Sequence, residues 1–335
     1  MNDLSNKWYK LPTGDKLKAF NFIIGGRGIG KSYDGINTCV TKYPGKFLYL
    51  RNTGVQLKES CGAFGNPFKK WAKDHNRDII MKMEGDHAIV YEYDSEGEKS
   101  IIGYGAALST FENLRSIDLS DVDFVLFDEF IEKRSLSFDQ YDSFKHMYET
   151  VNRNRELFGE PPLYVCLLSN AQRLGNPILR GYELIPIIEG MQRSGQHVAT
   201  VGNKRIELPE SEISELKKET ALYQNGDPNF NNQALSNAFT NDSFTNIKKM
   251  NLTEYSPVCM IDNICIYRHK SNSTFYVCGT PGTFEHKYRS KDNLIIFMRL
   301  YGIRLKLAYG SDQIYFSDYA TKIDILNILN MYMRG

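Results

Sequence analysis

The sequence predicts an α/β protein, built on a mostly parallel sheet with helices on both faces and followed by a smaller C-terminal α/β domain. A short apolar run leads into a glycine-rich turn at residues 25–30. Strand-like apolar runs then alternate with helix-like segments to about residue 205, where a polar, Asn-rich stretch replaces them. Alternation that begins at a glycine-rich turn is typical of parallel sheets covered on both faces.

Each element of the first domain has its own signal. Apolar runs bounded by turn residues indicate buried strands, and apolar residues at helical spacing indicate helices. Three short runs separated by turn signals indicate a small antiparallel insertion. We expect strands at 19–26, 45–51, 121–130, 161–171 and 197–202, helices at 31–42 and 138–158, and the insertion at 78–105.

The rest of the chain is divided by composition. At 335 residues it exceeds what one hydrophobic core usually organises. We expect a first domain at 1–205, a linker at 206–243 that contains one short polar helix, and a C-terminal domain at 244–335. In that last domain we expect strands at 257–269, 273–279, 303–310 and 313–318, and a final helix at 322–333.

Charge is distributed unevenly along the chain. The formal net charge is only +1, but residues 243–335 hold twelve Lys or Arg and seven Asp or Glu. A basic domain suits contact with a DNA backbone, although a solvated surface would have the same composition. Lys248 and Lys249, at the start of this domain, are candidate DNA contacts.

The sequence shows no sign of secretion, a membrane span or structural zinc. Its six cysteines form no C-x-x-C pair, and the N-terminus has no apolar signal region. No apolar run approaches the roughly 20 residues that span a bilayer. We therefore expect a soluble, intracellular protein with no membrane partner.

The glycine-rich turn matches a nucleotide-binding motif. GGRGIGKS, residues 25–32, fits G-x-x-x-x-G-K-[ST] between a predicted strand and a predicted helix. Its backbone N–H groups and the helix N-terminus would bind the phosphates of ATP, Lys31 would contact the β- and γ-phosphates, and Ser32 would bind Mg²⁺. For Arg27, a phosphate contact and a solvated side chain both remain open. The expected nucleotide-binding residues are Gly25, Gly26, Arg27, Gly28, Ile29, Gly30, Lys31 and Ser32.

A second motif separates the enzyme classes that share this loop. FVLFDEF, residues 124–130, is an apolar strand that ends in two acids. Asp128 fits the carboxylate that holds Mg²⁺, and Glu129 fits the base that activates water. A kinase needs no such base, because its substrate supplies the nucleophile. The pair predicts a P-loop NTPase of the additional-strand, catalytic-glutamate (RecA-like) type. Asp121 and Asp123, at the other end of the strand, are expected to be solvated.

Polar residues also end two neighbouring strands. Asn170 ends the strand at 161–171 and could contact the γ-phosphate or hold water, or simply cap the strand. Arg51 ends the strand at 45–51 and could pair with Glu129 and keep it from water, or form an ordinary salt bridge. Both would lie at the ligand-binding edge of a parallel sheet.

Three further arginines are candidates. Arg153 or Arg155, in RNR at the end of the predicted helix, could be an arginine finger that contacts a neighbouring subunit's γ-phosphate. Basic residues also suit helix C-termini without any such role. Arg115, in a polar loop, could contact a substrate backbone or be an ordinary surface residue.

Other functions remain to be weighed. A helicase should carry further motifs after the second acidic strand, and none is visible. A non-hydrolysing assembly scaffold would not need Glu129. Four C-terminal acids could in principle form a two-metal nuclease site, but no pair has motif-like spacing; they are Asp262, Glu285, Asp312 and Asp318.

Together these motifs resemble the DNA-packaging (encapsidation) ATPases of phi29-like tailed phages. GGRGIGKS, FDEF, NRNRE and LLSNA occur in that order in this family, which is of similar length, and the resemblance covers about residues 20–175. One departure is NTGVQL, residues 52–57, which lacks additional basic residues that the family carries there.

The resemblance implies roles for particular residues. Lys31 and Ser32 would bind ATP and Mg²⁺, Asp128 would hold the metal and Glu129 would activate water. Arg153 would be the finger that acts on a neighbouring subunit. Two more arginines would match family positions, Arg51 as the residue that restrains the catalytic glutamate and Arg115 as a basic residue in a loop facing the DNA channel.

The resemblance also implies a setting. Such proteins form a ring, typically a pentamer, on the portal of an empty capsid in the host cytoplasm and drive double-stranded DNA inward. They are absent from the mature virion, and some bind a phage structural RNA. Their C-terminal domain has an RNase H-type fold that has lost its catalytic acids and has no nuclease activity.

Overall fold

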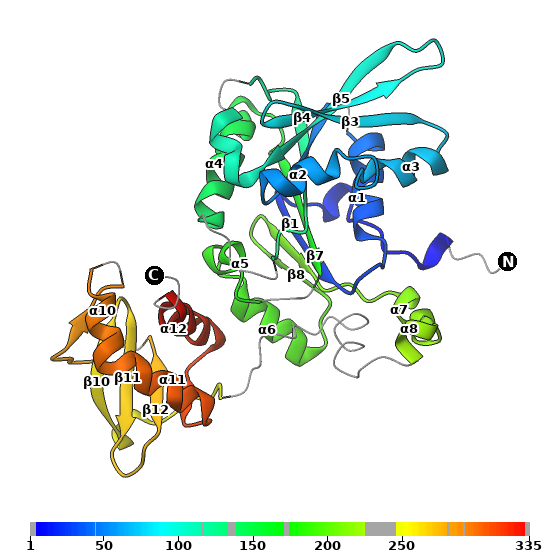
Figure 1. Ribbon diagram of the computed structural model, residues 1–335. Coiled ribbons are helices and arrows are strands. Elements are labelled where there is room, and N and C mark those ends of the chain that lie inside the picture. The colour runs from blue at the N-terminus through cyan, green and yellow to red at the C-terminus, as the bar shows by residue number, and fades with distance from the viewer. Residues whose placement is uncertain are drawn as a thin grey trace. The chain divides into compact units, whose positions relative to one another are not determined.

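The chain forms two compact units, Met1–Asn241 and Asp242–Gly335. A computed structural model describes residues 5–43, 45–114, 117–132, 139–170, 174–224, 246–279, 282–290 and 292–331 (Figure 1). Among these residues, no helix is both long enough and apolar enough to cross a membrane.

A nine-stranded sheet organises the first unit. Its strand order is β3-β4-β5-β2-β6-β7-β1-β9-β8. In this order, the six neighbours β5, β2, β6, β7, β1 and β9 pair in parallel. The outer strands β3 and β4 at one end, and β8 at the other, pair in antiparallel fashion. The strands are β1 Phe20–Gly25, β2 Lys46–Arg51, β3 Asp78–Glu84, β4 His87–Tyr93, β5 Lys99–Ala107, β6 Val122–Asp128, β7 Tyr164–Asn170, β8 Val198–Val201 and β9 Lys204–Glu207.

Helices cover both faces of this sheet, as the sequence predicts (Figure 1). On one face α1 packs so closely that a Cβ on Gly35 would lie 2.8 Å from Leu126 of β6. On the other face Phe144 of α4 stacks on Phe127 of β6. The helices are α1 Lys31–Thr41, α2 Gly54–Ser60, α3 Phe68–Asp74, α4 Gln140–Asn152, α5 Pro177–Gly181, α6 Ile185–Ser194, α7 Glu212–Lys218 and α8 Ala221–Gln224.

Four predicted features of this unit differ from the structure. The antiparallel insertion is not separate, because β5 pairs in parallel with β2 and so extends the main sheet. The helix predicted at 138–158 ends at Asn152, where Arg153 and Asn154 take left-handed φ of 46° and 57°. A strand not predicted, β9, pairs with β1. The expected boundary at 205 falls inside β9, and the first unit continues through α7 and α8.

The second unit contains a five-stranded sheet of order β13-β10-β11-β12-β14. Its three central strands form an antiparallel meander, and each outer strand pairs in parallel. The expected RNase H-type fold stays a prediction. The elements are β10 Tyr255–Ile261, β11 Ile264–His269, β12 Phe275–Cys278, β13 Lys287–Tyr288, β14 Ile314–Phe316, α10 Leu294–Phe297, a π-helical turn Met298–Gly302, α11 Ile303–Gly310 and α12 Tyr319–Met331.

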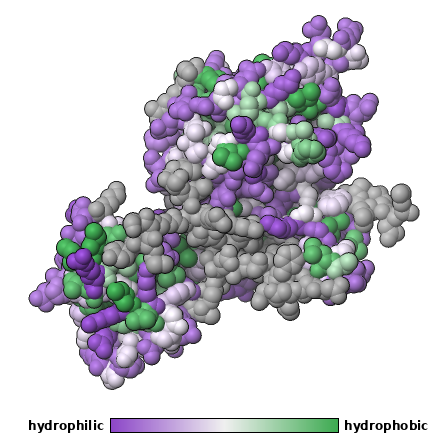
Figure 2. Space-filling view, viewed as in Figure 1, coloured by the Kyte–Doolittle hydropathy of each residue, from purple (hydrophilic) through white to green (hydrophobic). Residues whose placement is uncertain are grey.

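The strand predicted at 303–310 was wrong, because this segment is α11. Its apolar and basic residues alternate as in a half-buried strand, but the buried residues are Leu305 and Ala308, at helical spacing. Five large apolar side chains are exposed on α10, the π-helical turn and α11, where Figure 2 shows hydrophobic surface. This apolar stripe consists of Ile295, Ile296, Leu300, Ile303 and Leu307.

Candidate nucleotide-binding site

The parallel sheet brings several of the predicted site residues to one edge. Strands β2, β6, β7 and β1 are neighbours in that order and run in the same direction, so their carboxyl ends lie side by side. Those ends carry Arg51, Asp128, Asn170 and Gly25. This edge of an open α/β sheet is where such folds bind ligands.

The glycine-rich loop connects β1 to α1 as the motif requires. Gly28 and Gly30 take left-handed φ of 62° and 103°, which a glycine adopts without steric cost. The Lys31 ammonium group is buried and donates hydrogen bonds to the carbonyls of Gly25 at 3.1 Å and Gly26 at 2.6 Å. It also donates to Asn170 Oδ1 at 3.3 Å, which places Asn170 beside the loop.

Burial leaves the Lys31 charge poorly solvated. Desolvation, partly offset by Asp128, lowers the pKa of Lys31 to about 8. Carbonyl dipoles replace water only in part, so the ammonium group would gain from a full negative charge. The phosphates of a nucleotide carry such a charge.

Ser32 and Asp128 form a pair suited to a hard metal ion. The Ser32 hydroxyl donates to Asp128 Oδ1 at 2.9 Å, and Tyr49 donates to Asp128 Oδ2 at 3.4 Å. Burial raises the pKa of Asp128, although the nearby Arg51 charge opposes this. Because Mg²⁺ prefers hydroxyl and carboxylate oxygens, these residues fit it, and Ser32 and Asp128 would hold it next to the loop. When bound, Mg²⁺ neutralises phosphate charge.

Glu129 has a different environment from its neighbour. Its side chain is 56% exposed, and Arg51 Nη2 donates to its Oε2 at 2.7 Å. Arg51 Nη1 also lies 3.6 Å from Asp128 Oδ2, so one arginine bridges both acids. Glu129 takes φ of 55°, a left-handed conformation that costs a non-glycine residue about 1–2 kcal/mol. Strained residues of this kind cluster at functional sites.

Three buried amide side chains, which the sequence analysis missed, surround the backbone after Glu129. Asn52 Nδ2 donates to the Glu129 carbonyl at 2.9 Å, and Gln140 Nε2 donates to the Phe130 carbonyl and to Asn52 Oδ1, both at 2.6 Å. Asn176 Nδ2 donates to Gln140 Oε1 at 2.8 Å. We call Asn52, Gln140 and Asn176 the amide cluster. The local sequence carries no signal for it, because its members come from three separate segments.

The two arginines of RNR occupy different environments. Arg155 is nearly buried and donates to the Val122 carbonyl at 2.8 Å and to Asp123 Oδ1 at 3.3 Å. Asp123 also accepts from the Gly45 N–H, so the expectation that Asp123 is simply solvated was wrong. Arg153 is the C-cap of α4, is 48% exposed and lies 2.9 Å from Asp118. Of the two, only Arg153 has a side chain exposed enough to contact a partner.

Four sequence-predicted candidates remain: Arg27, Lys248, Lys249 and Arg115. The Arg27 side chain is exposed, as are those of Lys248 and Lys249 in the second unit. Arg115 lies outside the described residues. Across the described part of the chain, no group of three or more His, Cys, Asp or Glu is placed to hold a metal ion.

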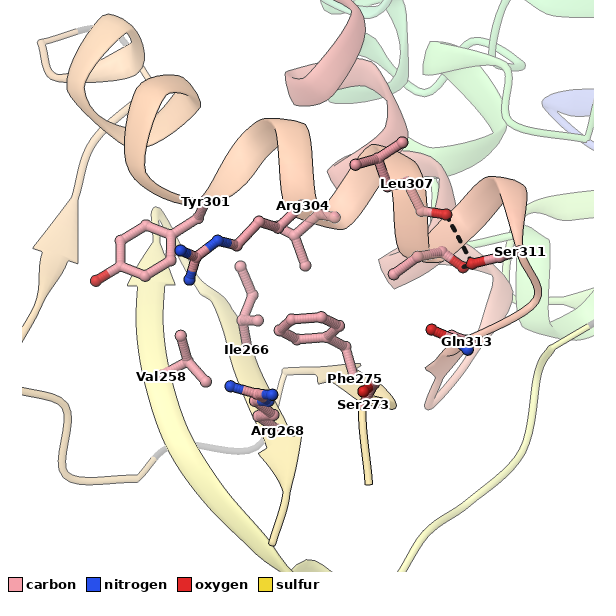
Figure 3. Close-up of a pocket in the computed structure, with 12 residues that line it drawn as sticks. Val258, Ile266, Arg268, Ser273, Phe275, Tyr301, Arg304, Leu307, Ser311 and Gln313 are labelled. Atoms are coloured by element: carbon pink, nitrogen blue, oxygen red, sulfur yellow. Dashed lines mark hydrogen bonds between the residues drawn. The ribbon is translucent and has the colours of Figure 1, made fainter. Parts of the chain in front are cut away.

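A cavity of about 560 Å³ lies in the second unit between the sheet and α11 (Figure 3). Arg268 of β11 and Arg304 of α11 border it, together with Phe275 and Tyr301. Both arginine side chains are exposed, and neither forms an ion pair with a described carboxylate. Two exposed guanidinium groups beside aromatic rings are a surface suited to phosphate groups.

Comparisons with known proteins identify relatives of this chain. The DNA packaging protein of Bacillus phage B103 is 29% identical over 245 residues, which cover 69% of this chain and 68% of that protein. The DNA packaging protein of Bacillus phage phi29 is 26% identical over 241 residues, covering 69% and 65%. The alignments thus span about two thirds of the length of these relatives.

The fold has a solved counterpart. The structure described as the bacteriophage Phi-29 viral genome packaging motor assembly matches with a TM-score of 0.63 at 19% identity, covering 95% of each chain. The family model described as Podovirus DNA encapsidation protein (Gp16) matches residues 9–276. Because this family model covers more than half of the sequence, the chain belongs to the podovirus DNA encapsidation protein family.

Proposed function

We propose that this protein is an ATP-driven motor that moves double-stranded DNA into an empty viral capsid. The observation that carries the proposal is the convergence of Lys31, Ser32, Asp128 and Glu129 at the carboxyl edge of the sheet. A kinase or a passive scaffold would not need the glutamate. The membership of a DNA encapsidation family identifies the work to which ATP hydrolysis is coupled.

In the proposed hydrolysis, Lys31 moves from the loop carbonyls to the β- and γ-phosphates, and Asn170, its present partner, lies beside the γ-phosphate. Glu129 accepts a proton from the attacking water. Arg51 now occupies one Glu129 oxygen and so restrains this base. Release of Arg51, when DNA or a neighbouring subunit arrives, would free the carboxylate for catalysis.

Arg153 completes the site of a neighbouring copy. It follows α4, whose first residue bonds to the Phe130 carbonyl at the nucleotide edge, and it pairs with Asp118, just before β6. Arg153 therefore lies at the opposite edge. The seven residues of β6, at about 3.3 Å each, separate these edges by roughly 20 Å. A side chain cannot cross that distance, so Arg153 would act in trans within a homo-oligomeric ring.

Family membership supports the proposed setting. The ring, a pentamer, would dock at the portal of the procapsid in the host cytoplasm, with or without a structural RNA. The exposed apolar stripe on α10–α11 is a surface that assembled proteins commonly cover. Lys248, Lys249, Arg268 and Arg304 would contact DNA phosphates in a sequence-independent way.

The first test is ATP hydrolysis by the full-length chain with and without double-stranded DNA, at low and moderate salt. A motor that grips the DNA backbone should hydrolyse ATP faster with DNA, and this stimulation should fade as salt rises. Arg268→Ala with Arg304→Ala should weaken stimulation and leave DNA-free turnover unchanged. If DNA does not change the rate of ATP turnover at any salt concentration, even when procapsids are present, the proposed DNA motor function is refuted.

The second test separates the two edges. Arg153→Ala and Glu129→Gln should each reduce turnover at least 100-fold, and both should retain ATP binding. Mixing the two inactive proteins should restore turnover, because some interfaces then combine an intact arginine with an intact glutamate. A Glu129→Gln protein that hydrolyses ATP at the normal rate would contradict the assigned base.

A further inference from the structure

A lysine outside the motif lies directly on the glycine-rich loop. Lys217, on α7, donates a hydrogen bond to the Arg27 carbonyl. Its Nζ also lies 2.7 Å from where a Cβ on Gly28 would be. A side chain at position 28 would therefore displace this ammonium group. Gly28 provides both the left-handed turn and the space for Lys217.

The N-terminal segment holds α7 in this position. The N-cap residue Ser211 donates through Oγ to the Lys7 carbonyl at 3.1 Å, and Lys7 pairs with Glu212 at 3.3 Å. Two residues later, the Tyr9 N–H donates to the Ile29 carbonyl of the loop at 3.0 Å. The loop, the N-terminal segment and α7 are thus linked, and Lys217 is brought to the loop by contacts on both sides.

The charges at the loop are unbalanced. The Lys217 charge contributes to lowering the pKa of Lys31, and burial lowers the pKa of Lys217 itself. Among described residues, Lys217 makes no ion pair, whereas its neighbour Lys218 pairs with Glu215 at 2.6 Å. Two ammonium groups near one loop, without a carboxylate for the second, favour an anion there.

We propose that Lys217 binds the phosphates of ATP in its own subunit, exchanging the Arg27 carbonyl for a phosphate oxygen. Because Lys217 is part of α7, the helix then changes position with the nucleotide state. This helix precedes the segment that leads to the second unit, so it is the first element after the sheet to respond to ATP. The inference rests on the proposed nucleotide site and not on DNA movement.

The test is equilibrium binding of fluorescent ATP and AMP analogues to full-length variants. Lys217→Ala should weaken ATP binding about tenfold, the loss expected for one hydrogen bond between charged groups. AMP binding should change less than twofold, since AMP lacks the β- and γ-phosphates. Lys217→Arg should restore most of the ATP affinity, and Lys218→Ala, the matched control, should leave both affinities unchanged.

Other results overturn the proposal. An unchanged ATP affinity in Lys217→Ala would overturn it. Tighter ATP binding would also do so, because it would mean that Lys217 only braces the nucleotide-free loop. Equal losses for ATP and AMP would show general damage. In the unmodified protein, ATP and not AMP should alter hydrogen exchange at residues 212–218, and no change there counts against the inference.

Failure here can be told from failure of the proposed function. If the unmodified chain binds no ATP, the nucleotide site itself is refuted. If it binds ATP but DNA never stimulates turnover, the proposed motor function is refuted. The role of Lys217 is then still decided by the ATP and AMP affinities of its variants.

Discussion

The two edges of the nine-stranded sheet differ in how their charged side chains are paired. Where the central strands β2 and β6 begin, three cations pair with carboxylates: Lys46 with Asp121, Arg155 with Asp123 and Arg153 with Asp118. Where the strands end, one arginine, Arg51, serves both Asp128 and Glu129, and the Lys31 ammonium group rests on carbonyls.

Two lysines make the contrast concrete. The hydrogen bond to Asp121 raises the pKa of Lys46, whereas burial lowers the pKa of Lys31 to about 8. Each is the first residue of its element, Lys46 of strand β2 and Lys31 of helix α1, so position at the start of an element does not explain the difference. The first edge is built for stability, and the second retains unsatisfied charge that a nucleotide can satisfy.

The largest loss of stability should come from the amide cluster. Asn52→Leu leaves the Glu129 carbonyl without its side-chain donor and removes one of the two acceptors of the Gln140 amide nitrogen, which should cost about 2–3 kcal/mol in the free energy of unfolding. It should also lower turnover more than tenfold while ATP affinity is kept, because the Glu129 backbone is no longer held. Urea unfolding and steady-state ATPase assays would measure both.

Asn21→Leu is the matched control at the opposite edge. Asn21 is also fully buried and makes three hydrogen bonds, to the backbone of Lys18 and Val165. It should cost similar stability and leave turnover per folded molecule unchanged. Equal turnover losses in the two variants would remove the distinction between the edges.

Arg155→Ala should cost about 2 kcal/mol, since Asp123 would remain half-buried without its cation and the Val122 carbonyl would lose its donor. Arg153→Ala should leave the unfolding midpoint in urea unchanged, because its ion pair is exposed. The same pair of variants should show the reverse order in ATP turnover. Similar stability losses for both would contradict the assignment of Arg155 as structural and Arg153 as functional.

Glu129→Gly should be more stable than Glu129→Ala by about 1 kcal/mol. Both variants lose the pair with Arg51, but only glycine adopts φ of 55° without strain. Both should be inactive. If the alanine variant has the same free energy of unfolding or a higher one, the backbone at position 129 stores no strain.

The smallest expected effect is the uptake of a proton by Lys31 when ATP binds. Lys31 without nucleotide loses its proton above about pH 8, whereas bound phosphates favour its charged form. ATP binding should therefore take up a fraction of a proton at pH 8.5, and affinity should fall as pH rises further. Calorimetry in two buffers of different ionisation enthalpy measures this uptake, which should be smaller at pH 7. No difference between these pH values would contradict the lowered pKa.

Much of the site could be predicted because its residues lie next to the ends of strands. The eight residues of GGRGIGKS are contiguous, and Asp128 and Glu129 directly follow apolar runs, so strand order and direction suffice to bring them together. The pairing of Arg51 with Glu129 follows from the same rule. Parallel alternation to residue 205 likewise predicted the layers of the first unit.

Other features depended on contacts between distant segments. Alternating residues at 303–310 suggested a strand, but burial of Leu305 and Ala308 made the segment helical. The expected end of the first domain cut through β9, which is placed by pairing with β1.

The sequence by itself determined the chemistry of the nucleotide edge, because motif residues adjacent in the chain keep their spacing in any fold of this class. Only the tertiary structure decided what surrounds that edge. The amide cluster unites Asn52, Gln140 and Asn176, and Lys217 meets Arg27 across 190 residues. A hydrogen bond depends on a distance of about 3 Å, and for residues so far apart in sequence only the complete fold sets that distance.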